Sequence, residues 1–270
     1  VVFSGGSSGS AMLLGYPEAA STIVNGEFVR PAALEARIVD ALGAPPAEAS
    51  PNNALNRWVV DAFLRFGLSE LRGDVTAIWF GDPDHTAHDK GLDAPPTRQA
   101  LRFVDEEVGR IEDALRSRGQ LASTNIVVTS DHGFSTHTGT LRLAALVEPF
   151  ARPLPDGTPD IVVTEGAVNV RGPRDPARVQ AIVAELQRRP EVGAIFTRPR
   201  SRGGTEGVIA GTLSFSVARW EHPRSADILV SANWDRGSAG DGLPGRTTQG
   251  GAAGHGTSSP YDIHNVLVAA

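Results

Sequence analysis

The strongest constraint on the fold is a repeated order of strand, loop and helix between residues 75 and 133. Val75–Phe80 is a nearly unbroken β-branched and aromatic run, which is typical of a strand buried on both faces of a parallel sheet. Between Thr97 and Leu115 apolar residues recur every three or four positions, which predicts a helix. Asn125–Ser130 is a second apolar run. Because such crossovers are right-handed, we expect both strands to be parallel in one sheet, with their loops at one carboxyl edge.

The rest of the chain fits an α/β fold, in which a mostly parallel sheet is flanked by helices and carries a small inserted α+β subdomain. Ser50 and Pro51 resemble the start of a helix that reaches Phe66. We expect the main domain to span residues 1–150 and 225–270 and the insertion to span residues 151–224. The insertion has short strands near 161–164, 167–171 and 192–197 and a helix near 176–189. Asp227–Ser231 is expected to return to the main sheet, and Gly237–Gly256 to form a long irregular loop.

Composition narrows the chemistry that the chain can support. The 270 residues carry 25 Lys and Arg against 31 Asp and Glu, and the basic residues are scattered, which excludes the basic surface of a protein that binds a nucleic-acid duplex. The chain contains no cysteine, so any metal ligands must be His, Asp or Glu. No apolar run reaches the roughly 20 residues that a membrane-spanning helix needs.

Three short loops concentrate histidines and carboxylates, and each is flanked by glycine or proline. A divalent metal such as zinc takes three or four His or carboxylate ligands. Asp84 and His88 supply two ligands, and His255, between two glycines, is the natural distant third. Asp131 and His132 are adjacent at a strand end, where both side chains can turn towards one pocket, and they suit a second metal nearby. Taken singly, each loop also has an ordinary interpretation as a turn, a helix cap or a surface loop.

The strings that carry these residues resemble the nucleotide pyrophosphatase/phosphodiesterase branch of the alkaline phosphatase superfamily. The matching strings are Asp82-Pro83-Asp84-His85-Thr86-Ala87-His88 with Gly91, Ser130-Asp131-His132-Gly133-Phe134, and Gly254-His255-Gly256. The resemblance implies an alkaline phosphatase-like fold with two zinc ions, one held by Asp84, His88 and His255 and the other by Asp131 and His132. It also implies hydrolysis of phosphodiester or pyrophosphate bonds, with small nucleotide-type substrates favoured and a periplasmic or secreted location.

The family's nucleophile and first-strand aspartate are not visible in this chain. The resemblance places a Thr or Ser nucleophile upstream of residue 1, and we expect the chain to be truncated at both ends. The Ser-rich opening Ser4–Ser10 could be interpreted as a phosphate loop, but it lacks the lysine of a P-loop. Two alternatives stay open: a phosphonate or phosphate monoester hydrolase of the same superfamily, and a metal-binding pseudoenzyme. Trp234, after a strand end, is the candidate for stacking on the substrate, and the sequence does not determine the oligomeric state.

Overall fold

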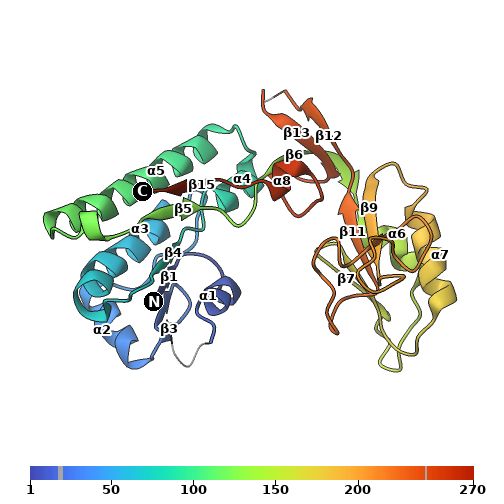
Figure 1. The fold of residues 1–270 in the computed structure, drawn as a ribbon, viewed down its shortest axis with the longest axis horizontal. Coiled ribbons are helices and arrows are strands. Elements are labelled where there is room, and N and C mark those ends of the chain that lie inside the picture. Colours follow the sequence, from blue (N-terminus) through green and yellow to red (C-terminus); the bar gives the residue numbers. More distant parts are fainter. Residues whose placement is uncertain (18–20, 241) are drawn as a thin grey trace. The chain divides into compact units, whose positions relative to one another are not determined.

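The computed structural model describes residues 1–17, 21–240 and 242–270, and these form two compact units (Figure 1). The first unit comprises residues 1–128 and 267–270, and the second comprises residues 129–266. The second unit is therefore inserted into the first along the sequence. The expected domain limits near 150 and 225 fall inside the second unit, and as domain limits they stay a prediction.

The first unit is built on a four-stranded sheet in the order β3-β2-β1-β4. β1 is parallel to both β2 and β4, and β2 is antiparallel to β3. The strands are β1 (Val2–Ser4), β2 (Ile23–Asn25), β3 (Val29–Arg30) and β4 (Ala77–Trp79). The predicted strand at Val75–Phe80 is therefore present as β4 and pairs in parallel, but it lies at the end of the strand order and is only half-buried.

Helices cover the two faces of this sheet. Alternate residues of a strand point to opposite faces, and accordingly Val2 and Ile23 pack against Ala11 of α1, whereas Phe3 and Val24 belong to the larger core. That core is closed by α2, α3 and α5 and by the π-type helix η2. The helical segments are α1 (Ser8–Leu14), α2 (Ala33–Leu42), α3 (Asn53–Ala62), η2 (Phe63–Leu71), α4 (Asp84–Lys90), α5 (Pro95–Ser117) and the short 3-10 turn η3 (Leu121–Ser123).

The predicted helices are present, with differences at their boundaries. The helix expected from Ser50 begins at Asn53, because the Asn52 amide donates to the buried carboxylate of Asp82 at 2.5 Å and stays outside the helix. The helix expected from Thr97 is α5, and Gly119 follows it with a φ of +67°. Among the described helices none combines the length and hydropathy needed to cross a bilayer.

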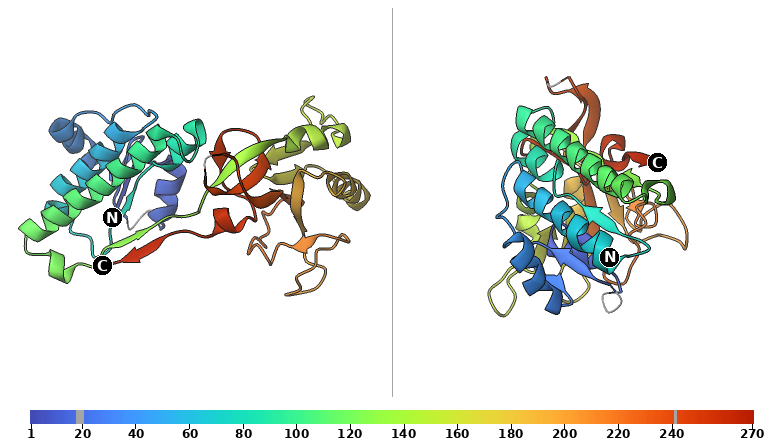
Figure 2. Two further views of the ribbon diagram at one scale, coloured as in Figure 1. Left: turned by 90° about the horizontal axis from the view of Figure 1, so that it is seen from above. Right: turned by 90° about the vertical axis from the view of Figure 1, so that its left-hand side faces the viewer.

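The prediction that Asn125–Ser130 joins the main sheet is wrong. Its strand, β5 (Val127–Thr129), pairs instead with β15 (Leu267–Ala269) in a separate two-stranded ribbon, and the two strands run side by side in Figure 2. Ile126 and Ala270 exchange both main-chain hydrogen bonds, each 2.9 Å long. The side chain of Val127 is 58% exposed. A short apolar run indicates a strand but not its partner, and here the equally apolar C-terminal run is the partner.

The second unit contains a five-stranded sheet in the order β10-β9-β11-β8-β7, which is mostly antiparallel. The short strands predicted between 161 and 197 are present in this sheet, and the helix predicted between them is present as α7. Asp227–Ser231 does not return to the main sheet as expected, because β11 lies between β9 and β8. The elements are β7 (Ile161–Thr164), β8 (Ala167–Val170), β9 (Val192–Thr197), β10 (Leu213–Ser214), β11 (Ile228–Ala232), α6 (Leu143–Val147), η4 (Glu148–Phe150) and α7 (Pro176–Leu186).

A second sheet of this unit has the order β12-β13-β6-β14. The expected irregular loop at 237–256 is therefore largely wrong: apart from position 241, which lies outside the described residues, it contains the end of β12, all of β13 and all of β14. These strands are rich in glycine and polar residues, so hydrophobic periodicity does not reveal them. The elements are β6 (Ser135–Leu141), β12 (Trp234–Ser238), β13 (Pro244–Gln249), β14 (Ala253–Gly254) and the short helix α8 (Pro260–Ile263).

Candidate metal centre

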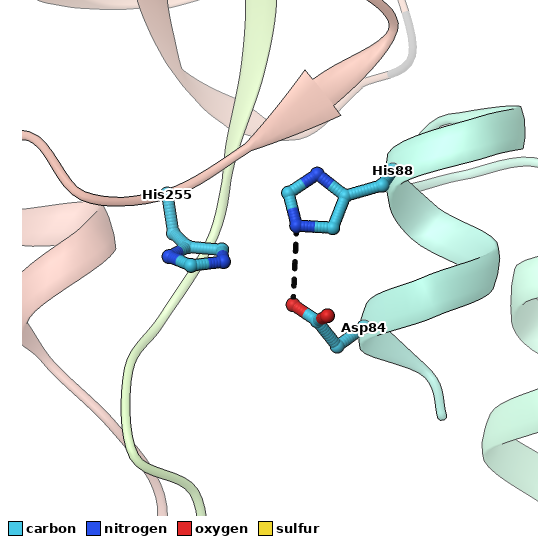
Figure 3. A group of neighbouring side chains, drawn as sticks. All are labelled: Asp84, His88 and His255. Atoms are coloured by element: carbon cyan, nitrogen blue, oxygen red, sulfur yellow. Dashed lines mark ion pairs between the residues drawn. The ribbon is translucent and has the colours of Figure 1, made fainter. Parts of the chain in front are cut away.

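Helix α4 presents the first pair of predicted ligands. Asp84 and His88 are four residues apart, so their side chains lie on one face of the helix. Asp84 Oδ1 and His88 Nε2 are 3.4 Å apart, and both side chains are partly exposed (Figure 3, dashed line). The neighbouring Asp89 forms an ion pair with Lys90, whose ammonium lies 2.8 Å from its carboxylate. This contact lowers the pKa of Asp89 below its ordinary value. Asp84 and His88 are therefore the donors that α4 offers.

A buried carboxylate fixes the start of this helix. Asp82 is 3% exposed, and its Oδ1 accepts hydrogen bonds from the amide and the hydroxyl of Thr86, at 3.0 and 2.7 Å. Its Oδ2 accepts the bond from the Asn52 amide. These bonds satisfy a free amide in the first turn of α4 and link that turn to the residue before α3. Asp82 thus sets the helix on which Asp84 and His88 stand.

In the second unit, Asp131 and His132 form a second pair. Asp131 Oδ2 lies 3.4 Å from His132 Nε2, so both side chains turn towards one point. His132 Nδ1 lies 2.9 Å from the carbonyl oxygen of Gly133. A carbonyl can only accept, so Nδ1 carries the hydrogen, and in the neutral ring Nε2 keeps its lone pair. A bonding partner on the other ring nitrogen is the usual way in which a protein orients a metal-binding histidine.

His255 lies in the same unit as this pair and contacts it directly. Its ring stacks on that of His132, with the centroids 3.4 Å apart and the planes 15° apart, and it meets the Phe134 ring edge-on at 5.5 Å. The following residue, Gly256, has a φ of +90°, a backbone conformation that favours glycine. His255 therefore lies next to His132 and is followed by a backbone conformation that favours glycine.

The two carboxylate–imidazole pairs fit a metal ion better than a direct hydrogen bond. An N–H···O bond spans about 2.7–3.2 Å, and both pairs, at 3.4 Å, are longer than that. Two atoms that each lie about 2.0–2.2 Å from one tetrahedral zinc ion are about 3.3–3.6 Å apart. The donor types are those that zinc takes, so the residues present fit the implied metal.

The structure brings the predicted ligands together within each unit: Asp84 with His88 in the first, and Asp131, His132 and His255 in the second. Figure 3 draws Asp84, His88 and His255, each of which offers one ligand atom of a suitable type. The sharing of one ion by His255 with Asp84 and His88 stays a prediction.

Three of the four remaining histidines, His85, His137 and His222, have the following side-chain contacts. His85 points to Glu48, with 3.2 Å between Nδ1 and Oε1. His137 Nδ1 lies 3.0 Å from the Gly250 carbonyl oxygen, and His222 Nδ1 accepts the Arg224 amide at 3.1 Å. The Trp234 ring meets the Tyr261 ring edge-on at 6.4 Å and is partly exposed. Its role in substrate binding stays a prediction.

The structure gives no support to a phosphate loop in the Ser-rich opening. Ser7 caps the seven-residue helix α1 by accepting the Ser10 amide at 3.3 Å. A pocket of about 240 Å³ beside Gly5 and Gly6 has the acidic residues Glu27 and Glu48 among those that line it. These negative charges oppose the binding of a phosphate group there.

Sequence reasoning missed two buried aspartates, Asp82 and Asp262. Asp262 is 3% exposed, and its Oδ2 accepts the amide and the hydroxyl of Thr257 at 3.0 and 2.6 Å. Its signal was the Ser259-Pro260 helix start just before it. The signal for Asp82 was a threonine four residues later, at the position where a capped first turn ends.

Three comparisons place this chain among known proteins. The human ectonucleotide pyrophosphatase/phosphodiesterase family member 7 is 35% identical over 63 residues, which are 23% of this chain and 14% of that protein. Murine ectonucleotide pyrophosphatase/phosphodiesterase 5, in an inactive variant complexed with AMP, superposes with a TM-score of 0.53 at 15% identity over 79% of this chain and 51% of that one. For alkaline phosphatase PafA the TM-score is 0.57 at 15% identity, with coverage of 80% and 44%.

These structural likenesses show an alkaline phosphatase-like fold, in agreement with the predicted fold class. The chain spans about half the length, or less, of the relatives that it matches. The profile described as Type I phosphodiesterase / nucleotide pyrophosphatase matches residues 8–256, which is most of the chain and includes all three histidine-bearing loops. The chain therefore belongs to the Type I phosphodiesterase / nucleotide pyrophosphatase family.

Proposed function

We propose that this chain is the metal-binding part of a hydrolase that cleaves phosphodiester or pyrophosphate bonds with two zinc ions. The observation that carries the proposal is the pair of carboxylate–imidazole contacts, Asp84–His88 and Asp131–His132, each 3.4 Å long. Asp84, His88 and His255 would hold one zinc ion, and Asp131 and His132 would hold the other. When bound, two such cations stabilise negative charge on the attacking and leaving oxygens of a phosphoryl transfer.

The residues of the chain prepare this site for an anionic substrate. Two aspartates and three imidazoles carry a net negative charge when the rings are neutral, and this charge repels a phosphate group until cations neutralise it. The Gly133 carbonyl holds the His132 hydrogen on Nδ1, which keeps Nε2 available as a ligand. Asp82 and the first turn of α4 hold Asp84 and His88 on one helix face.

The choice of substrate class rests on the family and on the relatives. The family's description names phosphodiesterase and nucleotide pyrophosphatase activities, and the murine relative was solved with AMP. Small nucleotide-type diesters are therefore the leading substrates, and a nucleic-acid duplex is not expected. The nucleophile is a Thr or Ser expected upstream of Val1. We also propose a periplasmic or secreted location, on the same family resemblance.

Zinc binding is the first test. Zinc-reconstituted wild-type protein should contain more than one zinc per chain by elemental analysis, and His88→Ala and His255→Ala should each contain less. His85→Ala is the matched control, because His85 lies on the same helix but contacts Glu48. Less than one zinc per chain in the wild type, or equal zinc in wild type and His88→Ala, would contradict the proposal.

Activity is the second test, and it separates the alternatives. A longer protein that includes the upstream segment should hydrolyse a chromogenic phosphodiester faster than a phosphate monoester or a phosphonate, whereas the 270-residue chain should not exceed a zinc blank. Preference for the monoester or the phosphonate would favour the alternative hydrolase. Zinc binding without turnover in the longer protein would favour the metal-binding pseudoenzyme.

We also propose that Trp234 stacks on an aromatic group of the substrate. The ring is partly exposed and is braced by Tyr261, and an aromatic face stacks on a nucleobase with an energy of about 1–3 kcal/mol. In the longer protein, Trp234→Leu should raise KM for a nucleotide diester by roughly 5- to 150-fold. It should leave KM for a diester without an aromatic group unchanged. Equal effects on the two substrates would show that Trp234 does not stack on the base.

A further inference from the structure

We propose that Asp262 is a positioning residue that holds the His255 loop against the segment carrying Asp131 and His132, without binding a metal itself. The inference rests on the proposed metal-binding function and assigns to this buried carboxylate a role that neither the family match nor the ligand set gives it.

Asp262 connects two segments that are far apart in the sequence. Its Oδ2 accepts hydrogen bonds from the amide and the hydroxyl of Thr257, two residues after His255. Its Oδ1 accepts the hydroxyl of Ser135, three residues after His132. Its main-chain oxygen accepts the Gly133 amide at 2.7 Å. Asp262 is therefore hydrogen-bonded both to the segment that follows His132 and to the segment that follows His255.

These bonds leave Asp262 unsuited to be a ligand. The residue is 3% exposed, and its two carboxylate oxygens already accept three hydrogen bonds out of the roughly four that a carboxylate can accept. The two segments carry His132 and His255, whose imidazole rings are stacked with their centroids 3.4 Å apart. Because Thr257 and Ser135 are both fixed to the same carboxylate, Asp262 determines where His132 and His255 meet.

Other bonds hold residues 129–130, before His132, to residues 265–266, after α8. The Thr129 hydroxyl donates to the Val266 carbonyl at 2.8 Å, and the Asn265 side-chain amide donates to the Ser130 carbonyl at 2.5 Å. These contacts do not involve Asp262. A variant at position 262 should therefore keep the segments paired at this end and lose the alignment of the two rings.

The central variant is Asp262→Asn, which keeps the size of the side chain but replaces one acceptor oxygen with an NH2 donor. If the NH2 faces Thr257, the bond from the Thr257 amide is lost. If it faces Ser135, whose hydroxyl can turn to accept, the bonds from Thr257 go to a neutral oxygen and lose the strength that a charged acceptor gives them. Partners that orient metal ligands typically change metal affinity by 10- to 100-fold. Zinc affinity, measured by competition with a chromophoric chelator, should fall by roughly this factor in Asp262→Asn.

Asp160→Asn is the matched control. Asp160 is 5% exposed and lies in the same unit, but it pairs with Arg178 at 2.6 and 2.7 Å and does not contact a proposed ligand. This variant should lose stability and keep wild-type zinc affinity. The ring signals of His132 and His255 in an NMR spectrum of the metal-free protein should move in Asp262→Asn and stay in place in Asp160→Asn.

Position 257 gives a second pair of variants in case Asp262→Asn does not fold. Thr257→Val removes the hydroxyl that donates to Asp262 and should weaken zinc binding, and Thr257→Ser restores the hydroxyl and should recover the affinity. Failure of the wild-type chain to bind zinc would overturn the proposed function itself. Wild-type binding with unchanged affinity and unchanged histidine signals in Asp262→Asn, or in Thr257→Val if the former does not fold, would overturn the positioning role alone.

Discussion

Gly133 is the position at which one added carbon should disturb the candidate site most directly. A Cβ at Gly133 would lie 2.5 Å from the His264 oxygen and closer still to the Tyr261 oxygen, whereas real Cβ atoms essentially never come within 3.0 Å of another atom. To bring the Tyr261 oxygen out to 3.0 Å from this Cβ, helix α8 would have to move by about 1 Å, which stretches the 2.7 Å bond between Gly133 N and Asp262 O. Overpacking of this kind costs about 1–3 kcal/mol. We therefore expect Gly133→Ala to destabilise the second unit by that amount.

Hydrogen exchange followed by mass spectrometry measures this effect for each unit separately, because it reports on individual peptides. A cost of about 1–3 kcal/mol corresponds to roughly 5- to 150-fold faster exchange in peptides that cover α8 and β6. Gly109→Ala is the control, because a Cβ there meets nothing within 4 Å in helix α5 and should stabilise the helix by about 0.8–1 kcal/mol. Unchanged exchange around α8 in Gly133→Ala would refute the reasoning.

Three further substitutions test buried carboxylates of the two units. Asp82→Asn should destabilise the first turn of α4 by about 0.5–2 kcal/mol, which hydrogen exchange of the Thr86 region would detect. Glu107 is fully buried and bonded to Arg57 and Arg110, so Glu107→Ala should lower stability in urea unfolding by about 1–3 kcal/mol. The guanidinium of Arg178 lowers the pKa of Asp160 from 3.8 to about 2. The ionised Asp160 therefore stabilises the folded state fully above pH 3.8, and this contribution is lost as the pH falls towards 2. Between these pH values the free energy of unfolding should fall more in the wild-type protein than in Asp160→Asn.

The fold was predictable where hydrophobic periodicity was strong and was missed where pairing depended on distant segments. The long amphipathic helix α5 was clear because its apolar residues recur every three or four positions from Leu101 to Leu115. The partner of β5 could not be predicted, because an apolar run is compatible both with a central strand and with a two-stranded ribbon. In the structure the C-terminal strand β15 is its partner. The strands β12, β13 and β14 were missed because threonine, glycine and arginine carry no alternating pattern.

The proposed metal ligands could be identified from the sequence, but the buried residues that hold the ligand-bearing segments in place could not. Histidine and aspartate in three short polar segments identify the donors by their chemistry, although the first of these segments, expected as a loop, forms helix α4. The carboxylates of Asp82 and Asp262 could not be found in this way, because a buried aspartate and a solvated one look alike in sequence. Their roles depend on Thr86 and Thr257, whose hydroxyls face them only after folding.

Gly133 and Asp262 of α8 contact each other through the bond between Gly133 N and Asp262 O. The stability costs of substituting the two residues should therefore not be additive. In Gly133→Ala the helix is pushed away from Gly133, which already weakens the bond that Asp262 accepts from Ser135. Adding Asp262→Asn then removes interactions that are partly lost, so the double variant should cost less than the sum of the two single variants. Residues in direct contact typically show coupling energies of about 0.5–3 kcal/mol, whereas distant sites add within about 0.3–0.5 kcal/mol. Stability from urea unfolding of the wild type, both single variants and the double variant measures the coupling. Additive costs would mean that Gly133 is needed only for local packing and that the glycine and the aspartate do not form one structural unit.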